Sequence, residues 1–200
     1  MGLAPGYQEQ DYTAIAVVER LPRQRHDPPG KADESPPESD YRRCYLHRPP
    51  LGTPYPVIVK QVLAVLDTPP LSRSVPLVVD MTGLGAPVID RVREAGTQPH
   101  AVTIIGGIVV SQEDPFSSDV PKRDLVRVLI TLVREKRLKI PPPQRMPLAE
   151  PLLAALTPFS FSYEAGRESE HDDLVLAVVL ACWWGERNQG GAAGYSWTVR

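Results

Sequence analysis

One apolar segment near the end of the chain constrains the fold more than any other feature. The eleven residues from 174 to 184 are all apolar, so a helix formed here has no polar face. We therefore expect this helix to be buried inside the protein. The segment is too short to cross a bilayer, and no basic-then-apolar leader opens the chain, so we expect no membrane association.

Runs of β-branched and apolar residues alternate with segments of helical periodicity along the rest of the chain. The runs that indicate strands lie at 12–18, 41–46, 76–80, 100–105, 138–140 and 159–163. Helical spacing is found at 54–66, 87–94, 121–136 and 148–156, and a last helix begins at 171. We expect the first two strands to pair with each other. This order predicts an α/β fold with a central mixed β-sheet flanked by helices and beginning with an antiparallel hairpin.

Chain length and composition predict a single globular domain. A chain of 200 residues can bury a sizeable core, and 42% hydrophobic with 23% charged residues is typical of soluble proteins. We assign residues 1–187 to the domain and the Gly-rich residues 188–200 to a flexible tail. Five prolines and many charges predict a mobile loop at 21–40.

The formal net charge of −2 means that any DNA-binding surface must be confined to a local patch of positive charge.

Asp80 is the first candidate site residue. It ends the apolar run 76–80 and precedes a Gly-containing turn at 82–85. In open α/β sheets ligands bind beyond the carboxyl ends of the strands, which is where this pattern puts Asp80. The alternative is that Asp80 caps the turn or the following helix, as aspartates often do.

Asp172 and Asp173 form the second candidate, at the start of the last helix. The free amides and the dipole of a helix N-terminus favour one acidic residue there, which is the alternative to a functional role. Two adjacent carboxylates at the edge of a core repel each other, and a divalent cation relieves that repulsion. Hard oxygen ligands of this kind suit Mg²⁺ or Mn²⁺. The pair therefore predicts a divalent-metal site that includes Asp80.

Three further residues are weaker candidates. Asp11 precedes the first strand. A lone aspartate there is expected to be a solvated loop carboxylate. It becomes a candidate metal ligand if the first strand runs beside the strand that ends at Asp80. Lys122 and Arg123 begin the strong helix at 121–136. A basic pair at a helix start can bind a phosphate, but it is equally consistent with a solvated basic face.

Six short motifs also occur in a fixed order along the chain. They are GLAPG at 2–6, DYTA at 11–14, PY at 54–55, VVDMTGLG at 78–85, VPKRDL at 120–125 and HDDLV at 171–175. Together this ordered set resembles the C-terminal nuclease domain of the large terminase subunit of tailed bacteriophages and proviruses. The resemblance spans residues 2–186, nearly the whole chain.

The resemblance implies a ribonuclease H-like fold and a function. It implies a metal-dependent endonuclease that cuts concatemeric viral DNA during genome packaging, with two Mg²⁺ or Mn²⁺ ions. In this sequence Asp80 and Asp172 match the family's catalytic acids, Asp173 is the neighbour of the latter, and Asp11 is an accessory acid. The implied partners are double-stranded DNA, the terminase ATPase domain, the small terminase subunit and the portal, in the cytoplasm of the bacterial host.

One position departs from the family pattern. The family's first strand carries an aspartate in a Gly-x-Asp-x-Gly stretch, and this chain has Ala4 there. The missing carboxylate would help to bridge the two metals. An engineered change, natural decay or replacement by Asp11 would each explain Ala4. The sequence thus leaves open a catalytically disabled DNA-binding or packaging domain, and a resolvase- or transposase-like nuclease on the same fold. It contains no Walker-type loop, so we expect the ATPase half of the large subunit to be absent.

Overall fold

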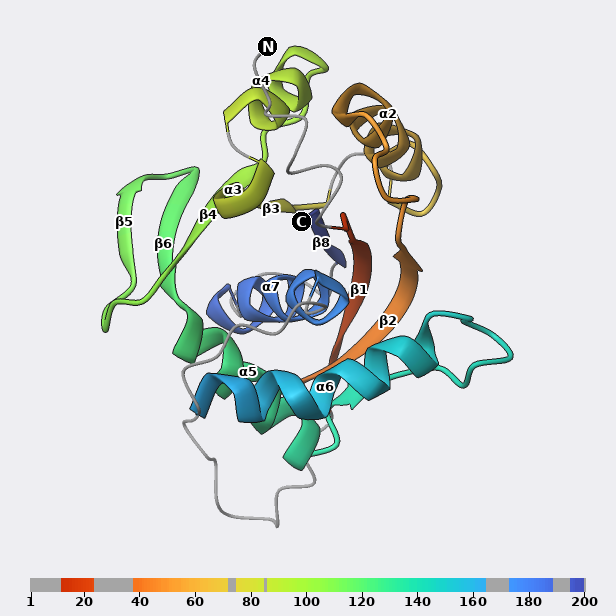
Figure 1. Cartoon of the computed structure of the whole chain (residues 1–200), viewed down its shortest axis with the longest axis vertical. Coiled ribbons are helices and arrows are strands. Elements are labelled where there is room, and N and C mark those ends of the chain that lie inside the picture. The colour runs from red at the N-terminus through yellow and green to blue at the C-terminus, as the bar shows by residue number, and fades with distance from the viewer. Residues whose placement is uncertain are drawn as a thin grey trace.

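A computed structural model describes residues 12–23, 38–71, 75–84, 86–164, 173–188 and 195–199. The strands are β1 (Ile15–Pro22), β2 (Ser39–His47), β3 (Leu77–Asp80), β4 (His100–Ile105), β5 (Ser111–Asp114), β6 (Ser117–Pro121), β7 (Leu138–Lys139) and β8 (Tyr195–Val199). The helices are α2 (Tyr55–Leu66), α3 (Met81–Leu84), α4 (Ala86–Glu94), α5 (Lys122–Arg134), α6 (Ala149–Glu164) and α7 (Asp173–Arg187). The protein therefore has the predicted α/β architecture (Figure 1).

The strands form one mixed sheet in the order β5-β6-β4-β3-β8-β1-β2-β7. β1 is antiparallel to both of its neighbours, β2 and β8, and β5 is antiparallel to β6. The remaining pairs are parallel, so β2, β3, β4, β6, β7 and β8 all run in one direction. The predicted antiparallel pairing of the first two strands is confirmed. The ends of β2, β3, β4, β6 and β8 meet at one side of the sheet, which we call the carboxyl edge.

The two faces of the sheet carry separate hydrophobic cores. On one face Ala14, Ala16, Val18 and Val78 pack with α5, α6 and α7. On the other face the alternate residues of the same strands pack with α2 and α4. Because side chains of a strand alternate between faces, β1, β3 and β4 each supply buried residues to both cores.

α7 lies between the sheet on one side and α5 and α6 on the other (Figure 1). Its residues from Asp173 to Trp183 are all buried. This enclosure explains why the helix needs no polar face and confirms its predicted burial. Among the described residues no helix is long and apolar enough to span a membrane.

The structure differs from the sequence-based assignment in five places. Residues 81–84 form the short helix α3, where a turn at 82–85 was predicted. Residues 159–163, predicted as a strand, continue α6, because Phe159 is fully buried in the core that α6 shares with α7. The polar strands β5 and β6 were not predicted. Residues 195–199 were assigned to a flexible tail, whereas they form β8 in the middle of the sheet. The predicted loop 21–40 is shorter, since β1 extends to Pro22 and β2 begins at Ser39, and residues 24–37 lie outside the described part.

Candidate functional site

Asp80 is the last residue of β3 and is almost fully buried, with 1% of its surface exposed. Val78, two residues earlier, belongs to the core on the α7 side, so alternation along the strand points Asp80 to the same face. Its Oδ1 accepts a hydrogen bond from the backbone N–H of Thr82 at 2.8 Å. The Thr82 hydroxyl in turn accepts one from the N–H of Ile104 at 2.9 Å. Asp80 therefore does cap α3, the short helix after β3, and this helix is tied to β4 through Thr82 and Ile104.

Asp173 is the first residue of α7, and its carboxylate is bound by Arg48. Arg48 Nε donates to Oδ2 and Arg48 Nη2 donates to Oδ1, both at 2.9 Å. The guanidinium also lies over the ring of Tyr12, 4.9 Å from its centroid. The Asp173 side chain is 6% exposed and that of Arg48 22%. This is a bidentate, largely desolvated ion pair between segments that are 125 residues apart in the chain.

Arg48 was not identified from the sequence, and it changes how the paired aspartates are interpreted. The expected repulsion between Asp172 and Asp173 called for a cation, and the Arg48 guanidinium supplies that positive charge at Asp173. The only indication in the sequence was a basic residue two positions after the end of a predicted strand. Nothing in its spacing could show that it would meet the last helix.

Strand register puts Arg48 and Asp80 in one row. Val79, Val199, Ile15 and His47 are matched across β3, β8, β1 and β2, and Asp80 and Arg48 each follow their strand's member of this row. They are three strand spacings apart, or about 14 Å between backbones. Ala14, which directly precedes Ile15 and is buried on the α7 side, lies between them in this row. Asp80 and the Arg48–Asp173 pair therefore lie at the carboxyl edge of the sheet.

The basic candidates lie at the same edge, on the other side of Asp80. α5 starts directly after β6, the second strand from β3, so Lys122 and Arg123 follow a strand end. The ammonium of Lys122 lies 5.8 Å from the centroid of the Phe159 ring. Arg123 donates from Nη2 to the carbonyl of Ile108, and its Nε is 3.6 Å from Asp124 Oδ1. Arg123 therefore contacts the loop between β4 and β5 and helps to hold it in place.

The remaining predicted residues, Asp11, His171, Asp172 and Ala4, lie outside the described part of the chain. The prediction for Asp11 depended on the first strand lying beside the strand that ends at Asp80. In the sheet β8 separates β1 from β3, so that condition is not met. Within the described ranges, no three His, Cys, Asp or Glu side chains gather closely enough to hold a metal ion.

Comparison of the chain with models of protein families, with curated proteins and with solved structures gives no match. The observations that bear on function are therefore those at the carboxyl edge. That edge brings together a buried carboxylate at a central strand, the acidic start of a buried helix with its arginine partner, and the basic start of α5.

Proposed function

We propose that this chain is a metal-dependent DNA endonuclease domain with a ribonuclease H-like fold, of the kind found in the large terminase subunit of tailed phages. The observation that carries the proposal is Asp80, a buried carboxylate at the end of a central strand, on the face covered by α7. Ligand sites of open α/β sheets lie at this edge. Such an edge can support several activities, and the ordered sequence motifs favour a nuclease among them.

Carboxylate oxygens are the donors that suit a hard divalent cation. Asp80 and Asp172 would hold Mg²⁺ or Mn²⁺ through carboxylate oxygens, with Asp173 as a further candidate ligand. The resemblance implies two ions. When bound, such ions lower the pKa of a water molecule and offset negative charge on the phosphate oxygens.

The chain's own residues contribute orientation and phosphate binding. The Thr82 amide fixes the Asp80 carboxylate, and the Thr82 hydroxyl anchors α3 to β4, so the carboxylate is held before any ligand arrives. Lys122 and Arg123, at the N-terminus of α5, supply positive charge for the DNA backbone. We place the protein in the host cytoplasm, acting on double-stranded DNA with a terminase ATPase domain, a small terminase subunit and a portal.

A catalytically disabled DNA-binding or packaging domain is the second candidate. Two observations favour it: Ala4 stands where the family has an aspartate, and both oxygens of Asp173 accept hydrogen bonds from Arg48. Each reduces the number of carboxylate oxygens available to a second ion. On this reading the carboxyl edge still binds DNA but does not hydrolyse it.

Nicking of supercoiled plasmid in the presence of Mn²⁺ separates these two functions. If the protein is a nuclease, the unaltered chain should nick the plasmid, and Asp80→Asn and Asp172→Asn should each abolish nicking. Asp90→Asn is the matched control, because Asp90 is 63% exposed and lies on α4, across the sheet from α7. Cutting only after Ala4→Asp identifies a disabled site. Preference for branched over linear duplex points to a resolvase-like enzyme, and no cutting by either chain together with no Mn²⁺ binding refutes the nuclease.

A further inference from the structure

The loop between β4 and β5 carries the two most exposed large apolar side chains of the described part of the chain. Ile108 is 70% exposed and Val109 is 73% exposed, whereas the other exposed side chains of this kind lie between 42% and 48%. The next residue, Val110, is partly buried against the core on the α7 side. Single exposed apolar residues are ordinary on a protein surface, but an adjacent pair with this exposure is a candidate contact surface.

This apolar pair lies at the carboxyl edge, beside the start of α5. β4 ends at Ile105 and runs parallel to its neighbour β3, so the loop leaves the sheet at the edge where Asp80 lies. Arg123, the second residue of α5, donates a hydrogen bond from Nη2 to the carbonyl of Ile108. The backbone of the apolar pair is thus held by a cationic side chain at the edge to which we assign DNA binding.

The surroundings of the pair carry a positive charge. The first two turns of α5 hold three cationic side chains and one carboxylate, which are Lys122, Arg123, Arg127 and Asp124. Asp119 on β6 adds a second carboxylate, which the hydroxyl of Ser111 binds at 3.0 Å. The loop itself, residues 106–110, contains no charged residue. An apolar tip beside a cationic helix start is complementary to duplex DNA, which has phosphates on its outside and stacked bases inside.

We propose that Ile108 and Val109 form an apolar wedge that enters duplex DNA between base pairs, while the cationic start of α5 contacts neighbouring phosphates. Proteins that bend DNA insert aliphatic side chains in this way, and the contacts that the bend permits offset the cost of unstacking. The inference rests on the DNA binding of the proposed function and deepens it, because it names how the duplex is held at the carboxyl edge. It needs no metal ion.

Two measurements on the intact chain in EDTA test the wedge. A short duplex with 2-aminopurine at several steps reports unstacking as a rise in fluorescence, and anisotropy of a labelled duplex gives the affinity. The wild type should produce the rise in fluorescence. Ile108→Ser/Val109→Ser should abolish this rise and weaken DNA binding roughly tenfold, because two aliphatic side chains no longer leave water on binding. Both side chains are exposed, so the melting temperature of the variant should equal that of the wild type.

The salt dependence of the affinity separates the wedge from the phosphate contacts. The double serine variant should keep the wild-type slope of log affinity against log salt, since it removes no charge, whereas Lys122→Gln should reduce this slope by about 0.9. Ile108→Leu/Val109→Leu retains two aliphatic side chains and should keep both the fluorescence rise and the affinity. Val133→Ser is the matched control, because Val133 is 48% exposed in the last turn of the same helix, and it should behave as the wild type.

The results also distinguish this inference from the proposed function. Wild-type protein that binds the duplex without a rise in fluorescence, together with a double serine variant that binds as tightly, refutes the wedge alone. Wild-type protein that does not bind duplex DNA at micromolar concentration refutes DNA binding at the carboxyl edge, and the wedge with it.

An anionic lipid surface is the other partner with a charged exterior and an apolar interior. Cosedimentation with vesicles of phosphatidylcholine and phosphatidylglycerol measures this binding. If the wild type bound these vesicles, and if the double serine variant lost vesicle binding while its DNA binding stayed unchanged, the loop would be assigned to a membrane surface and the wedge would be refuted.

Discussion

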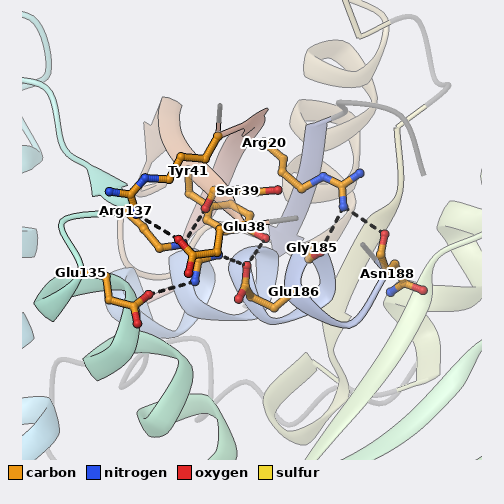
Figure 2. Close-up of polar contacts among 10 residues, drawn as sticks. Arg20, Glu38, Ser39, Tyr41, Glu135, Arg137, Gly185, Glu186 and Asn188 are labelled. Atoms are coloured by element: carbon orange, nitrogen blue, oxygen red, sulfur yellow. Dashed lines mark hydrogen bonds and ion pairs between the residues drawn. The ribbon is translucent and has the colours of Figure 1, made fainter. Parts of the chain in front are cut away.

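Tyr41 donates a hydrogen bond from its hydroxyl to Oε1 of Glu186 at 2.7 Å, and so joins the start of β2 to the last turn of α7 (Figure 2). The buried Arg137 binds the same carboxylate oxygen, and its Nε donates to the carbonyl of Ser39 at 2.8 Å. Burial and the neighbouring carboxylate raise the pKa of Tyr41 far above its ordinary value. Together with Arg48 and Asp173 at the other end, these contacts fasten both ends of α7 to the two ends of β2.

Glu186→Gln should destabilise the protein by about 2 kcal/mol, because hydrogen bonds to charged groups contribute roughly 1.5–3 kcal/mol. The change leaves Arg137, whose side chain is 4% exposed, with only the half-exposed Glu135 as an anionic partner among the described contacts. Urea unfolding measures the loss. Glu38→Gln is the matched control, since the Arg23–Glu38 pair is 44% and 49% exposed and should contribute less than about 1 kcal/mol. Equal losses in the two variants would contradict a special role for the Glu186 contacts.

Gly185→Ala should destabilise the protein by the order of 1 kcal/mol. A Cβ at this position would lie 2.7 Å from Cε1 of Tyr41, and overpacking of this kind costs about 1–3 kcal/mol, against a gain in helix propensity of about 1 kcal/mol. In a Tyr41→Ala background the collision is absent, so the same substitution should become stabilising. Thermal unfolding of the four chains measures this change of sign, and a constant effect in both backgrounds would exclude the steric explanation.

His100 should make the protein less stable as the pH falls. It begins β4, lies 3.0 Å from the Ser118 hydroxyl through Nε2, and packs on Trp184 with ring centroids 4.3 Å apart. Burial lowers the pKa of His100 below its ordinary value of 6.5. A backbone hydrogen bond with Pro115 and the nearby Asp114 carboxylate oppose this shift, and Arg187 adds to it. The unfolded chain therefore binds a proton below about pH 6.5 that the folded protein does not, and the free energy of unfolding falls as the pH decreases through this region.

His100→Gln removes this proton linkage. Urea unfolding between pH 5 and pH 8 should show a smaller loss of stability on acidification in the variant than in the wild type. The difference between the two profiles isolates His100 from the carboxylates, which titrate at lower pH. Identical slopes in both proteins would assign the pH dependence to other groups.

The parts of the fold that were predictable are those with local causes. α7 followed from an uninterrupted apolar run, and the bounds of β4 agree with the predicted 100–105. Residues 159–163 were misassigned because a short apolar run fits a strand or a buried helix equally well. β8 could not be predicted, since its partners β1 and β3 lie far away in the sequence and its neighbourhood is rich in glycine.

The same distinction between local and long-range causes applies to the candidate site. The position of Asp80 at the end of a strand could be predicted because a strand end is a local feature, and its capping contact with Thr82 is local too. The partner of Asp173 could not, because the Arg48 contact spans 125 residues and depends on the register of β2 with β1. A sequence pattern identifies carboxylates that are able to bind a cation. Only the tertiary structure shows which of them already has a cationic partner.

Lys122→Gln and Arg123→Gln should each weaken DNA binding and reduce its salt dependence. Each neutralised phosphate contact contributes about −0.9 to the slope of log affinity against log salt for duplex DNA. Fluorescence anisotropy with a labelled duplex in EDTA measures binding without cleavage. Lys60→Gln is the matched control, because Lys60 is exposed on α2, on the opposite face of the sheet. Since Arg123 also braces the Ile108 carbonyl, thermal unfolding must show that its variant remains folded. A control variant that reduces the slope as much as Lys122→Gln would show that DNA binding is not localised at the carboxyl edge.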